Sequence, residues 1–154
     1  KNKDLMIKKI KNLYLTLVKD FKIKKPNMIL AGINPHAGEN NFISKDDKKY
    51  LIPIINELKK SKIFIHGPVS GDGVINKENL KYYDAFIFTF HDQALIPFKI
   101  LSNYEGVNFT SNLDIIRVSP SHGTAEDLIG SKKAISKGIT NCFNLINKIA
   151  QNRK

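Results

Sequence analysis

Apolar residues along the chain follow two patterns, helical spacing and short uninterrupted runs. Residues 4–21 show the first pattern, with apolar side chains recurring every three or four positions. The same spacing predicts a helix from Ser44 to about Lys60, where Pro53 should end or kink the first turn. A third helix is expected from Ser131 to the end of the chain. Shorter helical segments are expected at residues 77–83 and 93–101.

The uninterrupted apolar runs predict buried strands. Residues 28–33 and 85–90 are the clearest runs, and such runs are typical of parallel strands covered on both faces. Shorter strands are expected at residues 63–65, 107–110 and 115–118. Strands that alternate with helices in this way predict an α/β fold. With 154 residues, the chain is long enough for one domain with a real core.

The composition narrows the class of protein. Apolar residues make up 42% of the chain and charged residues 25%, which is typical of a globular domain. No apolar run reaches 18 residues, so we expect no membrane-spanning segment, and no secretion leader is visible. The single cysteine, Cys142, has no internal disulfide partner and lies on an apolar helix stripe, so we expect a core residue and a cytoplasmic location.

The net charge of +11 raises the question of nucleic-acid binding. Arg117 and Arg153 are the only arginines, and every other basic residue is a lysine. Sites that grip phosphates or base edges usually favour the bidentate arginine fork. The lysines are scattered along expected helix surfaces, so we expect a solvated surface and no nucleic-acid partner.

Two histidines follow the two clearest strands. His36 comes after the run 28–33, and His91 comes directly after the run 85–90. Ligands of open α/β sheets collect past the carboxyl ends of strands, and neutral imidazole is a common ligand of divalent metals. If the strands are parallel neighbours, the two side chains converge. The alternative is that His91 caps a strand and Asp92 caps the next helix.

Two further polar residues have two readings each. Asp72 lies between two glycines and is either a turn former or a displayed carboxylate. Arg117 lies in an otherwise apolar run, so its charge needs a partner, which is either a structural carboxylate or an anionic ligand. Neither a Walker loop nor a Gly-x-Gly-x-x-Gly motif occurs, so the common nucleotide fingerprints are absent.

Four short motifs carry a resemblance to one family. They are Asn34-Pro35-His36-Ala37-Gly38-Glu39, His91-Asp92-Gln93, Gly106-Val107-Asn108 and His122-Gly123-Thr124-Ala125. In this order and spacing they resemble the 4-hydroxythreonine-4-phosphate dehydrogenases of pyridoxal phosphate biosynthesis. The resemblance covers nearly all of the chain and weakens in the first 25 residues.

The resemblance implies a fold and an assembly. The family is similar to the isocitrate and isopropylmalate dehydrogenases, with a mixed sheet flanked by helices, and it binds NAD (or NADP) without the usual glycine fingerprint. Its members are homodimers whose active site lies at the subunit interface, and they are about twice as long as this chain. Residues 1–154 are therefore expected to be the C-terminal portion of a two-domain dehydrogenase, lacking the N-terminal half and catalytically silent alone.

The resemblance also implies roles for particular residues. One divalent metal (Zn, Mg, Mn or Co) is held by His36, His91 and a third histidine of the absent half. Lys99, Asn108 and Arg117 contact the substrate, and Asp72 and Lys99 lie near the reacting centre as catalytic residues. His122, Gly123 and Thr124 belong to a loop that meets the adenosine side of NAD.

The implied reaction is oxidation of the secondary alcohol of 4-phosphooxy-L-threonine by NAD. The 3-oxo acid then loses carbon dioxide and leaves 3-amino-2-oxopropyl phosphate. A metal bound to the alcohol would lower its pKa, and Lys99 and Arg117 would offer positive charge to the anionic groups.

Ser121, Ala94, Gly71 and Gly73 depart from the family pattern, which bears on the cofactor loop and the exact substrate more than on the reaction class. Two alternatives are open. One is a sister enzyme that oxidises a phosphorylated four-carbon sugar acid such as 4-phosphoerythronate or the threonate. The other is a non-enzymatic basic module, which predicts steeply salt-dependent nucleic-acid binding.

Overall fold

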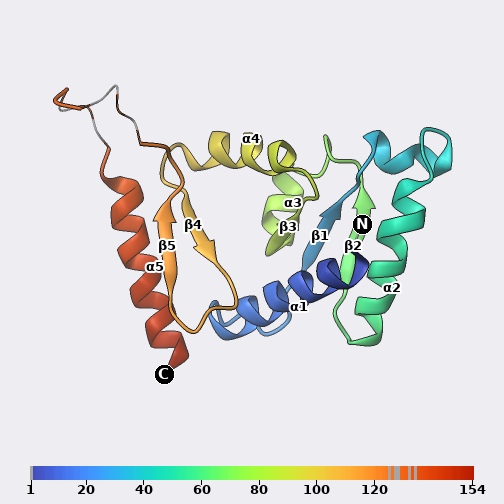
Figure 1. Cartoon of the computed structure of the whole chain (residues 1–154), viewed down its shortest axis with the longest axis horizontal. Helices are drawn as coiled ribbons and strands as arrows, with labels where there is room; N and C mark the ends of the chain where they lie inside the picture. The colour runs from blue at the N-terminus through green and yellow to red at the C-terminus, as the bar shows by residue number, and fades with distance from the viewer. Residues whose placement is uncertain (1, 125, 127–128, 132, 134) are drawn as a thin grey trace.

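The computed structural model describes residues 2–124, 126, 129–131, 133 and 135–154. Its strands form two separate sheets, a parallel sheet in the order β2-β1-β3 and an antiparallel hairpin, β4-β5. In Figure 1, α4 (His91–Ser102) and α1 (Lys3–Lys19) run between the two sheets on opposite sides of the molecule. The α/β prediction is confirmed, and the strands divide between two sheets instead of joining one mixed sheet.

The parallel sheet is built around β1 (Met28–Ala31), whose residues are all buried. It pairs with β2 (Ile65–Val69) on one side and with β3 (Ala85–Ile87) on the other. Because successive strand residues point to opposite faces, Met28 and Leu30 enter one core cluster and Ile29 and Ala31 enter another. Both faces of β1 are therefore covered, as its apolar run predicts.

Helices α1 and α2 (Ile52–Lys60) build the larger cluster on one face of this sheet. Asn2 caps α1 by accepting a hydrogen bond from the backbone N–H of Leu5. Apolar residues of both helices reach the cluster, among them Ile10, Leu17, Ile54 and Leu58. Pro53 lies in the first turn of α2, where its missing N–H costs nothing, and a single π-helical turn, η2 (Asp47–Leu51), precedes it.

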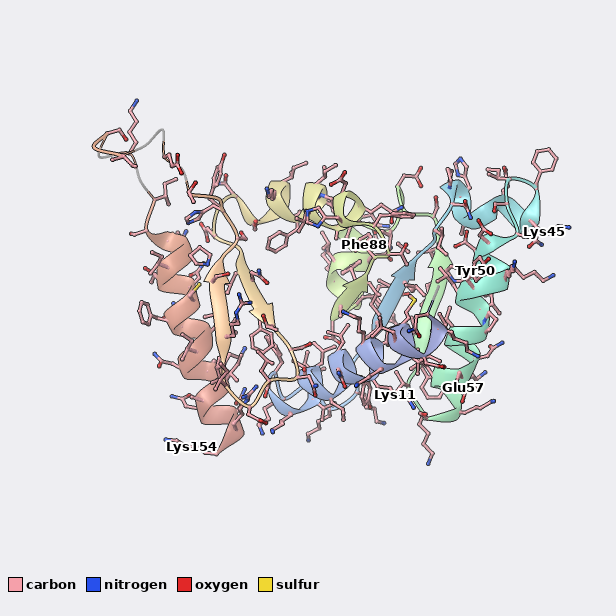
Figure 2. The ribbon with its side chains drawn as sticks, viewed as in Figure 1. Lys11, Lys45, Tyr50, Glu57, Phe88 and Lys154 are labelled. Atoms are coloured by element: carbon pink, nitrogen blue, oxygen red, sulfur yellow. The ribbon has the colours of Figure 1, made fainter. Side chains whose placement is uncertain are left out.

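The opposite face of the sheet has a smaller cluster around Val74. Phe88, labelled in Figure 2, follows β3 and packs against this cluster together with Phe86. The short helix α3 (Lys77–Tyr82) leads into β3, and Asn76 caps it through the backbone N–H of Asn79. In the described part of the chain, no helix has the length and apolar character needed to cross a membrane.

The hairpin is formed by β4 (Val107–Thr110) and β5 (Arg117–Pro120), and α5 (Lys137–Arg153) packs along β5. Figure 1 shows α5 on the outer side of the hairpin, away from the parallel sheet. The buried carboxylate of Asp20, just after α1, receives two hydrogen bonds of 2.8 Å from the Arg153 guanidinium. This ion pair ties the end of α5 to the end of α1.

Several predicted boundaries are wrong. The run 85–90 forms only the three-residue edge strand β3, which is half-buried, because the chain turns into α4 as soon as His91 is reached. The strand expected at residues 63–65 is instead β2, Ile65–Val69, because the segment from His66 to Val69 pairs with β1. Helix α5 begins at Lys137 instead of Ser131, and Lys132 and Ala134 of the expected helix lie outside the described residues.

Candidate functional site

The carboxyl ends of the three parallel strands lie at one edge of the sheet, and the predicted metal ligands follow two of them. β1 and β3 are directly paired in parallel, with Met28 opposite Ala85 and Leu30 opposite Ile87. His36 follows β1 in the segment η1 (Pro35–Asn41), and His91 is the first residue of α4 after β3. Both side chains are exposed. The strand pairing therefore brings the two histidines to the same edge.

The loop that carries His36 has an unusual backbone. His36, Ala37, Glu39 and Asn40 all have positive φ, between 44° and 54°, and Gly38 has a φ of 80°. This left-handed region is unfavourable for residues other than glycine, so contacts elsewhere must hold the loop in place. Gly38 is required for a second reason, because a Cβ there would come within 2.4 Å of the Ser44 carbonyl oxygen.

Asp47 provides the main contacts that hold this loop. Its carboxylate, 2% exposed, accepts hydrogen bonds from the backbone N–H of Ile33 at 2.7 Å and of Asn34 at 3.2 Å. It also accepts one from the Asn34 side chain at 3.2 Å. In the sequence, Asp47 is only an acid in the first turn of the helix expected from Ser44. The available signal was an acid on a predicted helix just after the histidine loop, and it does not reveal a tertiary contact.

Asp72 lies on the loop after β2, at the same edge of the sheet. Its carboxylate is exposed and accepts a short hydrogen bond from the Ser70 hydroxyl. This bond is the main cause that lowers the pKa of Asp72, and an electrostatic interaction with His36 makes a smaller contribution. The structure therefore places Asp72 within electrostatic reach of His36. Asp72 therefore combines the two alternatives that the sequence allows, since it lies in a turn and its carboxylate is exposed.

Gln93 connects the Asp72 loop to the start of α4. A Cβ on Gly71 would come within 2.8 Å of Gln93 Nε2, so the absence of a side chain at Gly71 lets the Gln93 amide lie against the loop. Within the described residues, Gln93 Oε1 is buried and has no hydrogen-bond partner. The loop after β2 and the helix that begins with His91 are thus in contact at the candidate site.

The side chains at this edge of the sheet are of the kind that binds the divalent metal implied by the family. Imidazole and carboxylate groups are suitable ligands for zinc and similar ions. However, among the described residues no three His, Cys, Asp or Glu side chains form a group that could hold a metal ion. His36 and His91 supply two donors, and catalytic zinc usually has three protein ligands. The donors are of the right kind, and in the described part of the chain they do not form a complete site.

A second group of predicted residues lies at the far end of α4. Lys99, His122 and Gly123 line a cavity of about 430 Å³ together with Tyr104. In a helix, the separation of Lys99 from His91 corresponds to about 12 Å along the axis. Thr124 is exposed, and Ala125 and Asp127 of the same predicted loop lie outside the described residues. Lys99 thus lies beside the predicted cofactor loop and a helix length away from the histidines.

Asn108 and Arg117 lie on the hairpin. Asn108 is opposite Ser119 and Thr110 is opposite Arg117, so both predicted substrate contacts are on the same face of the two strands. Arg117 is exposed, and its Nη1 donates a 2.9 Å hydrogen bond to the Thr110 hydroxyl. The expected burial of Arg117 is wrong, because β5 begins at this residue and Ile115 before it is 69% exposed.

Comparison with known proteins shows which family the chain belongs to. The profile of the family described as "Pyridoxal phosphate biosynthetic protein PdxA" matches residues 2–146. The 4-hydroxythreonine-4-phosphate dehydrogenase of Bacteroides thetaiotaomicron is 32% identical over 152 residues, covering 99% of this chain and 42% of that protein.

Two solved structures share the fold. The 4-hydroxythreonine-4-phosphate dehydrogenase of Klebsiella pneumoniae has a TM-score of 0.75 and 30% identity, over 94% of this chain and 43% of that one. A putative 4-hydroxythreonine-4-phosphate dehydrogenase of Salmonella typhimurium has a TM-score of 0.76 and 33% identity, over 93% and 44%. The chain spans less than half the length of these relatives. The family match confirms the resemblance seen in the four motifs, and the chain belongs to the PdxA family.

Proposed function

We propose that the protein containing this chain oxidises 4-phosphooxy-L-threonine with NAD or NADP, using one divalent metal ion. The observation that supports this most is the placement of His36, Asp72 and His91 past the carboxyl ends of adjacent parallel strands. This is where open α/β sheets bind ligands. Membership of the PdxA family gives the reaction class.

The residues of this chain have separate tasks in the proposed reaction. His36 and His91 are two of the metal ligands, and a third comes from outside the described residues. When bound, the metal would polarise the substrate alcohol and ease loss of its proton. NAD or NADP would accept the hydride from the same carbon, so that the alcohol becomes a ketone and the cofactor is reduced. Loss of carbon dioxide from the resulting 3-oxo acid would give 3-amino-2-oxopropyl phosphate.

Asp72 is suited to charge pairing. The Ser70 hydrogen bond lowers its pKa, so the carboxylate is ionised at neutral pH and is a weak proton acceptor. An ionised carboxylate at the same edge of the sheet as the candidate metal ligands favours binding of a cationic group, either the metal or the substrate ammonium. We therefore assign Asp72 to binding and orientation at the reacting centre.

Lys99, Asn108 and Arg117 are assigned to the anionic and polar groups of the substrate. Lys99 and Arg117 are both exposed, so neither charge is consumed by a buried carboxylate. His122, Gly123 and Thr124 are assigned to the adenosine side of the cofactor, beside Lys99. Lys99 and the loop at His122 lie far from His36 and His91. We propose that the extended substrate and cofactor, together with the partner subunit of a homodimer, span this distance.

A chimera tests this proposal. The matching segment of the Bacteroides thetaiotaomicron enzyme is replaced by this chain, and NADH formation from 4-phosphooxy-L-threonine is followed with Zn²⁺, Mg²⁺, Mn²⁺ or Co²⁺ present. We expect activity that is lost in the His36→Ala and His91→Ala variants and retained in His66→Ala, which serves as the matched control. A folded chimera whose activity survives loss of either histidine would contradict the assignment.

The alternatives are separate arms of the same experiment. Faster turnover of 4-phosphoerythronate than of 4-phosphooxy-L-threonine would identify the sister enzyme. The departures from the family pattern at Gly71, Gly73, Ala94 and Ser121 are compatible with that substrate. NADH formation by the unaltered chain alone would refute the expectation that it is silent. Steeply salt-dependent nucleic-acid binding without any turnover would favour the basic binding module.

A further inference from the structure

The backbone just before His36 is fixed by a carboxylate from a distant part of the chain. Both oxygens of Asp47 are occupied by hydrogen bonds from Ile33 and Asn34, at 2.7 to 3.2 Å. Asp47 is 2% exposed, so these bonds are shielded from water. A buried carboxylate needs such donors to offset its desolvation, and the donors here all belong to the segment that leads into Pro35 and His36.

Close packing makes this contact specific. A Cβ on Gly32 would come within 2.9 Å of Asp47 Oδ1 and 3.0 Å of Ala37 Cα, so the glycine leaves the space that the carboxylate occupies. The backbone N–H of Ile43 donates to the Gly38 carbonyl at 3.2 Å, which closes the other end of the loop. Figure 2 labels Lys45 and Tyr50 on the segment that carries Asp47, at the same end of the molecule as η1.

The loop needs such support because its backbone is unfavourable. Successive residues from His36 to Asn40 have positive φ, and only Gly38 adopts that region freely. A conformation of this kind persists where surrounding contacts over-determine it, and such positions cluster at functional sites. The Asp47 contacts lie at the entrance to the loop, directly before the strained residues.

We propose that Asp47 is a positioning residue for His36, holding the loop in the conformation that presents the imidazole to a divalent metal. The metal part of this inference rests on the proposed function. Asp47 itself does not contact the ion. Its carboxylate fixes the direction in which the chain leaves β1, and the side chain of His36 follows from that direction.

The first test is made without metal, on the unaltered chain and its variants. Asp47→Asn keeps the size of the side chain but replaces one acceptor oxygen by an NH₂ group facing N–H donors. We expect NMR signals and hydrogen exchange of residues 33–41 to change, while those of β3 and α4 stay the same. Asp46→Asn is the matched control, because in the described structure no hydrogen bond to the loop involves the Asp46 side chain. Unchanged loop signals in folded Asp47→Asn would overturn the proposal.

The second test measures the metal. Mn²⁺ is titrated into the chain while the imidazole signals of all four histidines are followed. We expect broadening of His36 and His91 in the unaltered chain and in Asp46→Asn. Asp47→Asn should need about tenfold or more Mn²⁺ to broaden His36, the range known for outer-shell partners of metal ligands. A purely structural role predicts a lower melting temperature with unchanged Mn²⁺ affinity in the folded protein, and that result would also overturn the proposal.

A second variant keeps the test decisive if Asp47→Asn fails to fold. Asn34→Ala removes one of the three donors and leaves the Asp47 carboxylate in place. It should shift the same loop signals and weaken the response of His36 to Mn²⁺ by a smaller factor; no change in either would count against the proposal. If the metal-free changes occur but Mn²⁺ never broadens His36 in the unaltered chain, the metal assignment fails while the control of the loop by Asp47 stands.

Discussion

The parallel-sheet region (β1–β3 with α1–α3) and the hairpin region (β4, β5 and α5) are stabilised in different ways. Among the described residues, the largest fully buried side chains are those of Met28, Ile29, Leu30, Leu51, Leu58, Val74 and Ile149, and Ile149 alone of these belongs to the hairpin region. Helix α5 even exposes Phe143 and Ile139, at 63% and 51%. The histidine loops therefore rest on a densely packed core, while the face that carries Asn108 and Arg117 does not.

Polar contacts connect α5 to other parts of the chain at both of its ends. Asp20 and Arg153 form the buried pair between α1 and α5, and Asn152 donates to the Asp20 carbonyl at 2.6 Å. At the other end of α5, Lys137 pairs with Glu105, and Asn141 donates to the Glu105 carbonyl at 2.9 Å. Such contacts orient an element well but add little stability where they are exposed. The candidate metal ligands therefore follow strands of the better-buried region, whereas two of the candidate substrate contacts, Asn108 and Arg117, lie on the less buried hairpin.

The largest effect should come from a cavity in the parallel-sheet region. Leu58 is 0% exposed in the main cluster, so Leu58→Ala should lower the free energy of unfolding by about 3–4 kcal/mol. Phe143→Ala removes a larger side chain from an exposed position and should change it by less than about 0.5 kcal/mol. Urea denaturation followed by circular dichroism measures both. Equal losses would show that the hairpin region is packed as tightly as the sheet.

A smaller effect is expected from the buried ion pair. Asp20→Asn leaves the Arg153 guanidinium, whose side chain is 17% exposed, without its charged partner. We expect a loss of about 2–3 kcal/mol, below the range for fully buried pairs because Arg153 retains some contact with water. Hydrogen exchange should rise in α5 and β5 and stay unchanged in β1. Faster exchange in β1 instead would mean that the two regions unfold as one unit.

The smallest effect concerns the single cysteine. Burial raises the pKa of the Cys142 thiol, so less reactive thiolate is present at neutral pH and labelling by a disulfide reagent should be slow. If labelling proceeds through local opening of α5, Asp20→Asn should speed it and Leu58→Ala should leave it nearly unchanged. Labelling that Leu58→Ala accelerates as much as Asp20→Asn would show that Cys142 is reached only by global unfolding.

The sequence predicts β1, α1 and α2 of the parallel-sheet region well because their signals are local, and it misplaces the ends of β2 and β3. The apolar run at Met28–Ala31 and the helical spacing in α1 and α2 each appear in the structure close to where the pattern indicates them. The hairpin region was harder, because the neighbouring Ile115 and Ile116 suggest a strand that instead begins at Arg117. Apolar residues that stay exposed carry no mark in the sequence that separates them from core residues.

The candidate site shows the same limit. The strand-end positions of His36 and His91 could be predicted, because parallel strands bring their carboxyl ends together. The contact between Asp47 and Asn34, and that between Gln93 and the loop at Gly71, depend on how loops fold back on the sheet. Neither spacing nor residue type reveals such contacts.

We propose that His36 and His91 bind one and the same divalent ion at the carboxyl edge of the parallel sheet. Calorimetric titration with Co²⁺ tests it most directly, on the unaltered chain, His36→Ala, His91→Ala and the double variant, with His66→Ala and His122→Ala as controls. A shared ion predicts that either single substitution removes most of the binding and that the double variant is hardly worse. Additive losses from two independent weak sites, or equal losses in the controls, would contradict the account.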